Sequence, residues 1–158
     1  MADDPAFDKA KQKAFRFLAL RARSEKELRD RLREKKFDGG VIDRVVSRLH
    51  ELNYLDDESF ARQWVRHLAV DRLSGNLKIE SGLREKGIPK ALSEKIIGEI
   101  RNEFPERQAI RKLIHKKQRN VKCREMDVKE KNRLARHLMA RGFAPGIIFE
   151  TIEGTEEE

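Results

Sequence analysis

The feature that most constrains the fold of this chain is an internal repeat. The segment Arg31–Phe37, which reads R-L-R-E-K-K-F, returns 51 positions later at Gly82–Ile88 as G-L-R-E-K-G-I. A weaker third copy, H-L-M-A-R-G-F, lies at His137–Phe143. Because turn residues recur together with apolar residues, chance similarity between unrelated amphipathic helices explains the pattern less well. Repetition at this period indicates one supersecondary unit that is stacked several times.

Apolar residues recur at helical spacing along the chain, and capping residues separate the resulting helices. In the first copy, this pattern predicts helices over about 6–21, 24–36 and 38–52. Ser24 and Asp38 are the predicted N-caps, and Glu27 is expected to complete a capping box with Ser24. No stretch alternates cleanly between apolar and polar residues, so no strand is predicted. Each copy is therefore expected to contain three helices.

The first and second copies meet in the stretch Leu49–Val65, L-H-E-L-N-Y-L-D-D-E-S-F-A-R-Q-W-V. Asp56 is the predicted N-cap of the next helix, with Leu55 and Phe60 placed to form a hydrophobic staple around it. The segment R-F-L-A at 16–19 recurs as R-H-L-A with an offset of 50 instead of 51. One residue is therefore inserted between the first and middle helices of the second copy.

These signals divide the chain into repeats at 6–54, 55–103 and 104–153, followed by an acidic tail at 154–158. Gly87 and Gly142 fall where middle helices should end in a left-handed residue. A unit of about fifty residues is marginally stable alone, so neighbouring units should share buried surface. We therefore predict an all-α fold of tandem three-helix repeats, arranged as an elongated, curved, solenoid-like molecule.

Composition limits the environment and the partners of the chain. Charged residues make up 41% and the net charge is +8, which favours association with an anionic partner. Cys123 is the only cysteine, so no internal disulfide is possible, and a reducing compartment is expected. The N-terminal sequence lacks the pattern of a signal peptide, and no apolar stretch reaches membrane-spanning length. The expected location is the cytoplasm, without membrane association.

Positive charge is concentrated in the third copy. Residues 101–141 contain fourteen Lys/Arg and five Asp/Glu, whereas the chain from Gly142 onward has five acids and no Lys/Arg. Positions 112, 116 and 119 share one helix face, because they are spaced by four and three residues. A lysine-rich face is often merely solvated, but few acids in this window are available to pair with it. The candidates for contact with a partner or with DNA are Arg62, Arg66, Lys112, Lys116, Lys117, Arg119, Lys122 and Arg124.

Catalytic and cofactor motifs are absent from the sequence. The histidines show no zinc-binding spacing, no phosphate-binding loop occurs, and no nucleophile–base pair can be named. We therefore expect no cofactor and no enzymatic activity. Trp64 could serve as a base-stacking platform beside Arg62 and Arg66, but its spacing from Phe60 and Leu68 favours a place in the core.

Three elements together identify a family: S-E-K-E-L-R-D-R-L, L-N-Y-L-D-D-E-S-F-A-R-Q-W-V and L-R-E-K-G-I-P. Their order and spacing resemble the RecX family of recombination regulators, from about Ala14 to Ile152. The resemblance implies a non-enzymatic inhibitor that binds filaments of RecA, the bacterial strand-exchange ATPase, on DNA. It implies suppression of ATP hydrolysis, strand exchange and co-protease activity, within homologous recombination, DNA repair and the SOS response.

Two functions stay open at this point. The first is the RecA regulator, a monomer that contacts the filament through several weak sites and reaches DNA weakly or through the filament. The second is a general basic helical protein that binds nucleic acids, in which phosphate contacts supply most of the affinity. The two differ in whether the ATPase of RecA is inhibited beyond simple competition for DNA.

Overall fold

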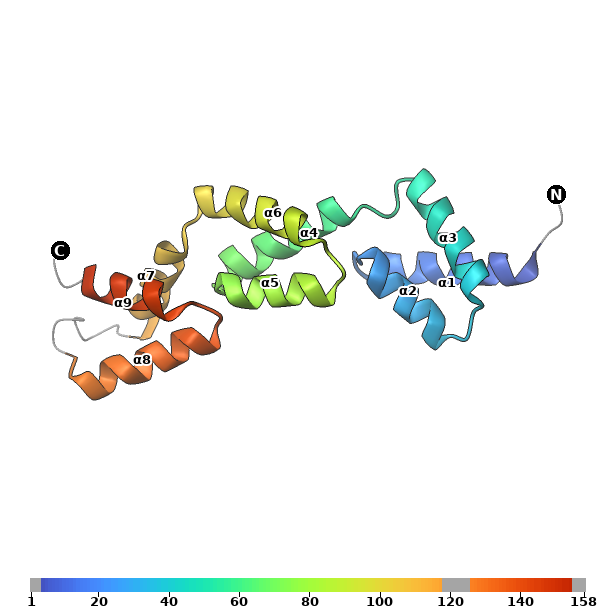
Figure 1. Cartoon of the computed structure of the whole chain (residues 1–158). Helices are drawn as coiled ribbons and strands as arrows, with labels where there is room; N and C mark the ends of the chain where they lie inside the picture. Colours follow the sequence, from blue (N-terminus) through green and yellow to red (C-terminus); the bar gives the residue numbers. More distant parts are fainter. Residues whose placement is uncertain (1–3, 118–125, 155–158) are drawn as a thin grey trace.

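The computed structural model describes residues 4–117 and 126–154, and those residues form helices without strands. The helices follow one another in a long row, with the two ends of the chain at opposite ends of the molecule (Figure 1). In order they are α1 (Pro5–Leu20), α2 (Glu25–Glu34), α3 (Gly39–Glu51), α4 (Asp57–Arg66), the π-helix η1 (His67–Asp71), α5 (Asn76–Glu85), α6 (Lys90–Glu103), α7 (Glu106–Lys117), α8 (Val128–Ala140) and α9 (Pro145–Gly154).

Buried apolar side chains gather in three separate cores. The first is built from α1, α2 and α3, the second from α4, η1, α5 and α6, and the third mainly from α7, α8 and α9. The prediction of an elongated all-α molecule with tandem three-helix repeats is therefore confirmed. The exact limits 6–54, 55–103 and 104–153 stay a proposed division, since Leu55 lies in the first core and Leu73 in the third.

The predicted N-caps are present. The side chains of Ser24, Asp38 and Asp56 accept hydrogen bonds from the backbone N–H groups of Glu27, Gly40 and Ser59, respectively. The predicted capping box at Ser24 is only half formed, because the Glu27 carboxylate does not return to the Ser24 N–H group. It pairs instead with Arg21, at 2.9 Å, and with Lys86 of the second repeat. A contact between repeats has thus displaced a local one.

The residue inserted in the second repeat is accommodated by η1. The backbone N–H of Arg72 donates to the carbonyl of His67 five residues earlier, at 3.0 Å, in place of the usual carbonyl four residues earlier. A π-turn of this kind holds one more residue per turn than an α-helix does. Leu73 follows in the left-handed region, with φ of 52°, and directs the chain back toward α5.

The first and second repeats meet at the beginning of α2. The backbone N–H of Glu25 donates to Oδ1 of Asp57, the first residue of α4, at 2.8 Å. This bond satisfies an amide that the helix itself leaves without a partner. Burial raises the pKa of the Asp57 carboxyl, and the hydrogen bond from Glu25 opposes that rise only in part.

The second and third repeats meet in the same way. Asn76, which lies 51 positions after Glu25, donates its backbone N–H to Oε1 of Glu106, the first residue of α7, at 2.8 Å. At both joints, the residue that begins the first helix of one repeat thus caps the middle helix of the preceding repeat. An acid at this position is the shared chemical requirement of both joints.

The second joint also connects two middle helices end to end. The backbone N–H groups of Gly75 and Leu77, at the start of α5, donate to the carbonyls of Arg141 and Gly142, at the end of α8. The donor–acceptor distances are 2.8 and 3.0 Å. The positive end of one helix dipole therefore faces the negative end of the other, and free amides pair with free carbonyls.

The middle helices end in left-handed residues, as predicted for Gly87 and Gly142, whose φ values are 75° and 95°. Each of these glycines packs against the preceding repeat, Gly87 on Lys26 and Gly142 on Lys78. The corresponding residue of the first repeat is Lys36, with φ of 67°. Lys36 is exposed, so a side chain is sterically possible there despite the backbone conformation.

Replacing Lys36 with glycine is expected to stabilise the first repeat by about 0.5–1 kcal/mol, because glycine adopts this left-handed conformation without steric cost. Urea unfolding followed by circular dichroism measures the change. Lys35→Gly is the matched control, since Lys35 has φ of −81° and should gain nothing. A lower midpoint for Lys36→Gly would show that the lysine side chain contributes more than the backbone costs.

Candidate partner and nucleic-acid interface

Arg62 and Arg66 lie on α4, and both are engaged with acids. Arg62 pairs with Glu58 at 3.1 Å and with Glu99 of α6, while Arg66 pairs with Glu103 of α6 at 2.8 Å. The hydrogen bond from Arg62 lowers the pKa of the Glu99 carboxyl. These two arginines therefore form a charge-compensated surface across the second repeat. Their role as partner contacts stays a prediction.

Lys112, Lys116 and Lys117 lie on α7 with exposed side chains. The ammonium of Lys112 lies 5.0 Å from the ring centroid of Phe104, which supports its position by a cation–π contact. None of the three lysines forms an ion pair with an acid among residues 4–117 and 126–154. The remaining predicted candidates, Arg119, Lys122 and Arg124, lie outside the described residues.

Ion pairs between described residues are more frequent in the first two repeats than in the third. In the first two repeats, basic side chains pair repeatedly with acids of the same or the neighbouring helix, such as Arg29 with Asp43 at 2.6 Å. In the third repeat, Arg107 pairs with Glu150 at 2.7 Å. The exposed lysines of α7 form no such pair with a described acid, so they face solvent or a partner. Surface charges without neighbouring acids generate the strongest long-range field of a molecule.

A further set of cations was not selected from the sequence. Lys129, Arg133 and Arg136 are exposed on α8 at spacings of four and three residues, which places them on one helix face. The spacing rule that selected the α7 lysines would also have found them. Close by, burial lowers the pKa of His137, and the charges of Lys117 and Arg141 lower it further. Cations of α7 and α8 thus act on the same histidine.

Trp64 belongs to the core of the second repeat, as its helical spacing favoured. It packs against that core, and Lys86 lies 5.6 Å from its ring centroid. Gly82 faces the same ring so closely that an added Cβ would overlap it. Contact with α5 therefore covers part of the ring that would have to stack on a nucleobase.

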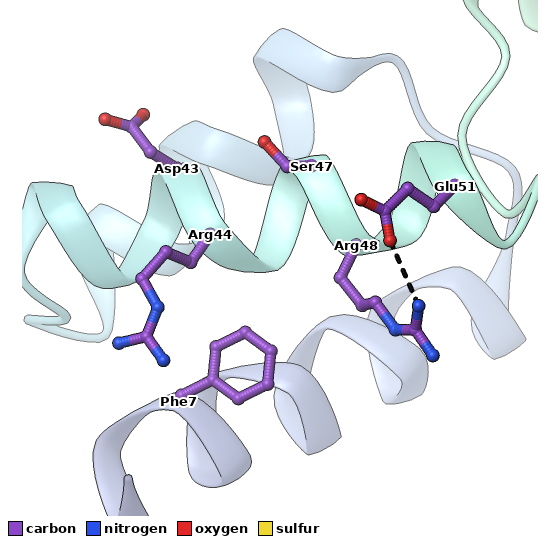
Figure 2. A pocket seen from close by; sticks show the side chains of 6 residues that line it. All are labelled: Phe7, Asp43, Arg44, Ser47, Arg48 and Glu51. Carbon is purple, nitrogen blue, oxygen red and sulfur yellow. Dashed lines mark hydrogen bonds and ion pairs between the residues drawn. The ribbon is translucent and has the colours of Figure 1, made fainter. Parts of the chain in front are cut away.

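A shallow hollow lies between α1 and α3 of the first repeat (Figure 2). Arg44 and Arg48 flank Phe7, and the guanidinium carbon of Arg44 is 4.9 Å from its ring centroid. Arg44 also pairs with Asp4 at 2.6 Å, and Arg48 pairs with Glu51 at 3.0 Å. Both guanidinium groups of this hollow are therefore already paired with acids.

Neither a metal centre nor a membrane anchor emerges from the described part of the chain. Residues 4–117 and 126–154 contain no group of three His, Cys, Asp or Glu side chains that could hold a metal ion. Within the same residues, no helix is both long enough and apolar enough to cross a bilayer. The geometry thus defines an elongated helical-repeat protein whose charged surface is suited to binding.

Comparison with known proteins assigns this architecture to a family. Models of the first, second and third three-helix domains of RecX match residues 10–49, 56–95 and 105–152. The regulatory protein RecX of Mycolicibacterium smegmatis is 31% identical over 156 residues, which cover 96% of this chain and 82% of that protein. The chain belongs to the RecX family.

Other relatives agree with this assignment. The regulatory protein RecX of Syntrophotalea carbinolica is 29% identical over 137 residues, which cover 87% of this chain and 90% of that protein. The crystal structure of RecX from Lactobacillus salivarius superposes with a TM-score of 0.81. The superposition covers 97% of this chain and 98% of that chain, and at 21% identity it shows the shared fold.

Proposed function

We propose that this protein inhibits the RecA recombinase by binding the RecA–DNA filament and suppressing its ATPase, strand-exchange and co-protease activities. The protein would act in the cytoplasm as a monomer and without catalysis of its own. Membership of a family of regulatory proteins supports this function. The observation that carries it is the set of exposed lysines on α7, Lys112, Lys116 and Lys117, which form no ion pair with a described acid and lie in the last repeat of the row.

The elongated shape suits a partner that repeats along an axis. A row of helical repeats can contact successive subunits of a filament, so that several weak contacts act together at a high effective concentration. The cations of α7 and α8 would face either the DNA phosphates inside the filament or an acidic surface of the recombinase. Both contacts would weaken as the salt concentration rises.

A titration of DNA-dependent RecA ATPase with this protein tests the proposal. Inhibition is expected at protein concentrations well below that of RecA, and it should persist when excess DNA is added. An ATPase rate that stays unchanged, or recovers fully on addition of DNA, would contradict inhibition through the filament. Purified RecA on single-stranded DNA and ATP are the only other components required.

General nucleic-acid binding is the second candidate function, and the basic third repeat favours it as well. Phosphate contacts alone would give comparable affinity for any DNA, with a steep dependence on salt. Binding to naked DNA as tight as binding to the RecA–DNA filament would support this function over the first.

A further inference from the structure

The middle repeat contains a pocket at a place where the other two repeats have larger apolar residues. It lies between α5 and α6 and has a volume of about 120 Å³. An engineered apolar cavity of about 150 Å³ accepts benzene, so this pocket has room for part of one side chain. The residues that line it are Glu80, Arg84, Ile88, Lys90, Ser93 and Glu94.

The pocket exists because two core positions have smaller residues in the middle repeat. Where this repeat has Ile88 and Ser93, the others have Phe37 and Ile42 in the first and Phe143 and Ile148 in the third. Ile42 and Ile148 are 1% and 0% exposed, which shows that this position normally belongs to the core. Both changes remove volume at the same place, and Ser93 introduces a hydroxyl group there.

The hydroxyl group of Ser93 is available to a ligand. The residue is 6% exposed, and its Oγ atom forms no hydrogen bond with the described residues. No buried side-chain oxygen of the described residues lacks a partner, so this Oγ atom is open to the pocket and to solvent, whereas an aliphatic side chain here would bury more apolar surface. Because Ser93 lines the pocket, a hydrogen-bonding group that enters the pocket can reach it.

The charges at the rim indicate which group would enter. In the first repeat, Arg29 of α2 and Asp43 of α3 join the two helices at 2.6 Å. The corresponding residues of the middle repeat are Glu80 and Glu94, so the cation of this pair is missing. Glu80 forms no ion pair with a described residue, and Glu94 has only a 3.7 Å contact with Lys90. Two carboxylates therefore line the pocket from opposite helices without a buried counterion.

Two basic side chains at the rim compete only weakly with an incoming cation for these carboxylates. The side chain of Lys90 is 90% exposed, so its contact with Glu94 is screened by solvent and readily replaced. Arg84 is also exposed and forms no ion pair with a described acid. It is therefore free to turn toward solvent or toward an acid of a partner.

We propose that this pocket receives a lysine or arginine side chain of the recombinase. The aliphatic stem would pack on Ile88, and the cationic head would donate hydrogen bonds to Glu80, Glu94 and Ser93. The partner would thus supply the cation that Arg29 supplies within the first repeat. This inference rests on the proposed function and adds to it a contact of opposite charge to that of the third repeat.

Two substitutions that copy the first repeat test the inference. Glu80→Arg supplies the missing cation within the chain, and Ser93→Ile fills the pocket. Each is expected to weaken binding to RecA on single-stranded DNA about tenfold, which corresponds to about one lost side-chain contact. Each should also raise the melting temperature, by about 2–4 °C for a stabilisation of about 1 kcal/mol. Fluorescence anisotropy and calorimetry provide the two measurements.

Glu85→Arg is the matched control, because Glu85 is exposed on α5, does not line the pocket and undergoes the same change in charge. Its affinity should stay within about twofold of the wild type. Wild-type affinity in both pocket variants would overturn this inference and leave the proposed function intact. A wild-type protein that does not bind the filament would overturn both. Self-association that Glu80→Arg abolishes would identify a second copy as the occupant and overturn the assignment to the recombinase.

Discussion

Replacing Gly75 with alanine is expected to separate the third repeat from the second. A Cβ atom at this position would overlap the carbonyl group of Gly142, whose backbone is fixed by the hydrogen bonds between α8 and α5. To remove this overlap, the end of α8 and the start of α5 must move apart, which costs about 3 kcal/mol or more. Calorimetry should show one unfolding transition dividing into two, because repeats that lose their interface unfold independently.

Gly98→Ala provides the matched control for this substitution. Gly98 lies within α6, and a Cβ built there has no described atom within 4 Å apart from its chain neighbours and the backbone of its own helix. Alanine should therefore stabilise the helix by about 0.5–1 kcal/mol. If Gly75→Ala retained a single transition at the wild-type temperature, the close approach of α8 and α5 would not hold the repeats together.

Reversing the charge of Lys112, Lys116 and Lys117 to glutamate is expected to lower the affinity for RecA on single-stranded DNA about a hundredfold at low salt. All three side chains are exposed and form no ion pair with a described acid, so their positive charge is available to an anionic partner. The dependence of affinity on salt should also become shallower, since fewer counterions are released on binding. Anisotropy titrations at several salt concentrations measure both effects.

The control carries the same change in net charge at the opposite end of the molecule. Lys9, Lys13 and Arg16 lie on α1 and form no ion pair with a described acid. Their replacement by glutamate should change the affinity by less than about fivefold, through long-range attraction alone. Equal losses in the two triple variants would show that the total charge of the chain governs binding and that the third repeat has no special part in it.

Local chemistry made much of the fold predictable. Ser24, Asp38 and Asp56 are helix caps because a short oxygen-bearing side chain precedes each apolar stripe, and they cap as expected. Gly87 and Gly142 recur at the ends of repeated segments, and only a left-handed backbone explains that placement. The single-residue shift between repeat offsets likewise corresponds to η1.

Contacts between repeats could not be predicted from spacing alone. Glu27 fits a capping box locally, but Lys86, 59 residues later, attracts its carboxylate away from the helix start. Arg62, a candidate contact from the sequence, is likewise paired with Glu99, which is 37 residues away in the sequence. The pairing depends on which helices lie side by side, and the hydrophobic pattern leaves that open. The lack of ion pairs at the lysines of α7 could be predicted, because few acids lie near them in the sequence.

The π-turn of η1 allows a repeat to gain one residue without changing the position of the next repeat. Each residue added to an α-helix turns all that follows by about 100°, which would rotate the next repeat away from its neighbour. A wider turn takes up the additional residue where it occurs, and Asn76 still meets Glu106. The contact between the second and third repeats is therefore retained despite the insertion. An insertion absorbed in this way leaves the orientation of the following repeat unchanged. Repeats can therefore diverge in length while the contacts between them are preserved.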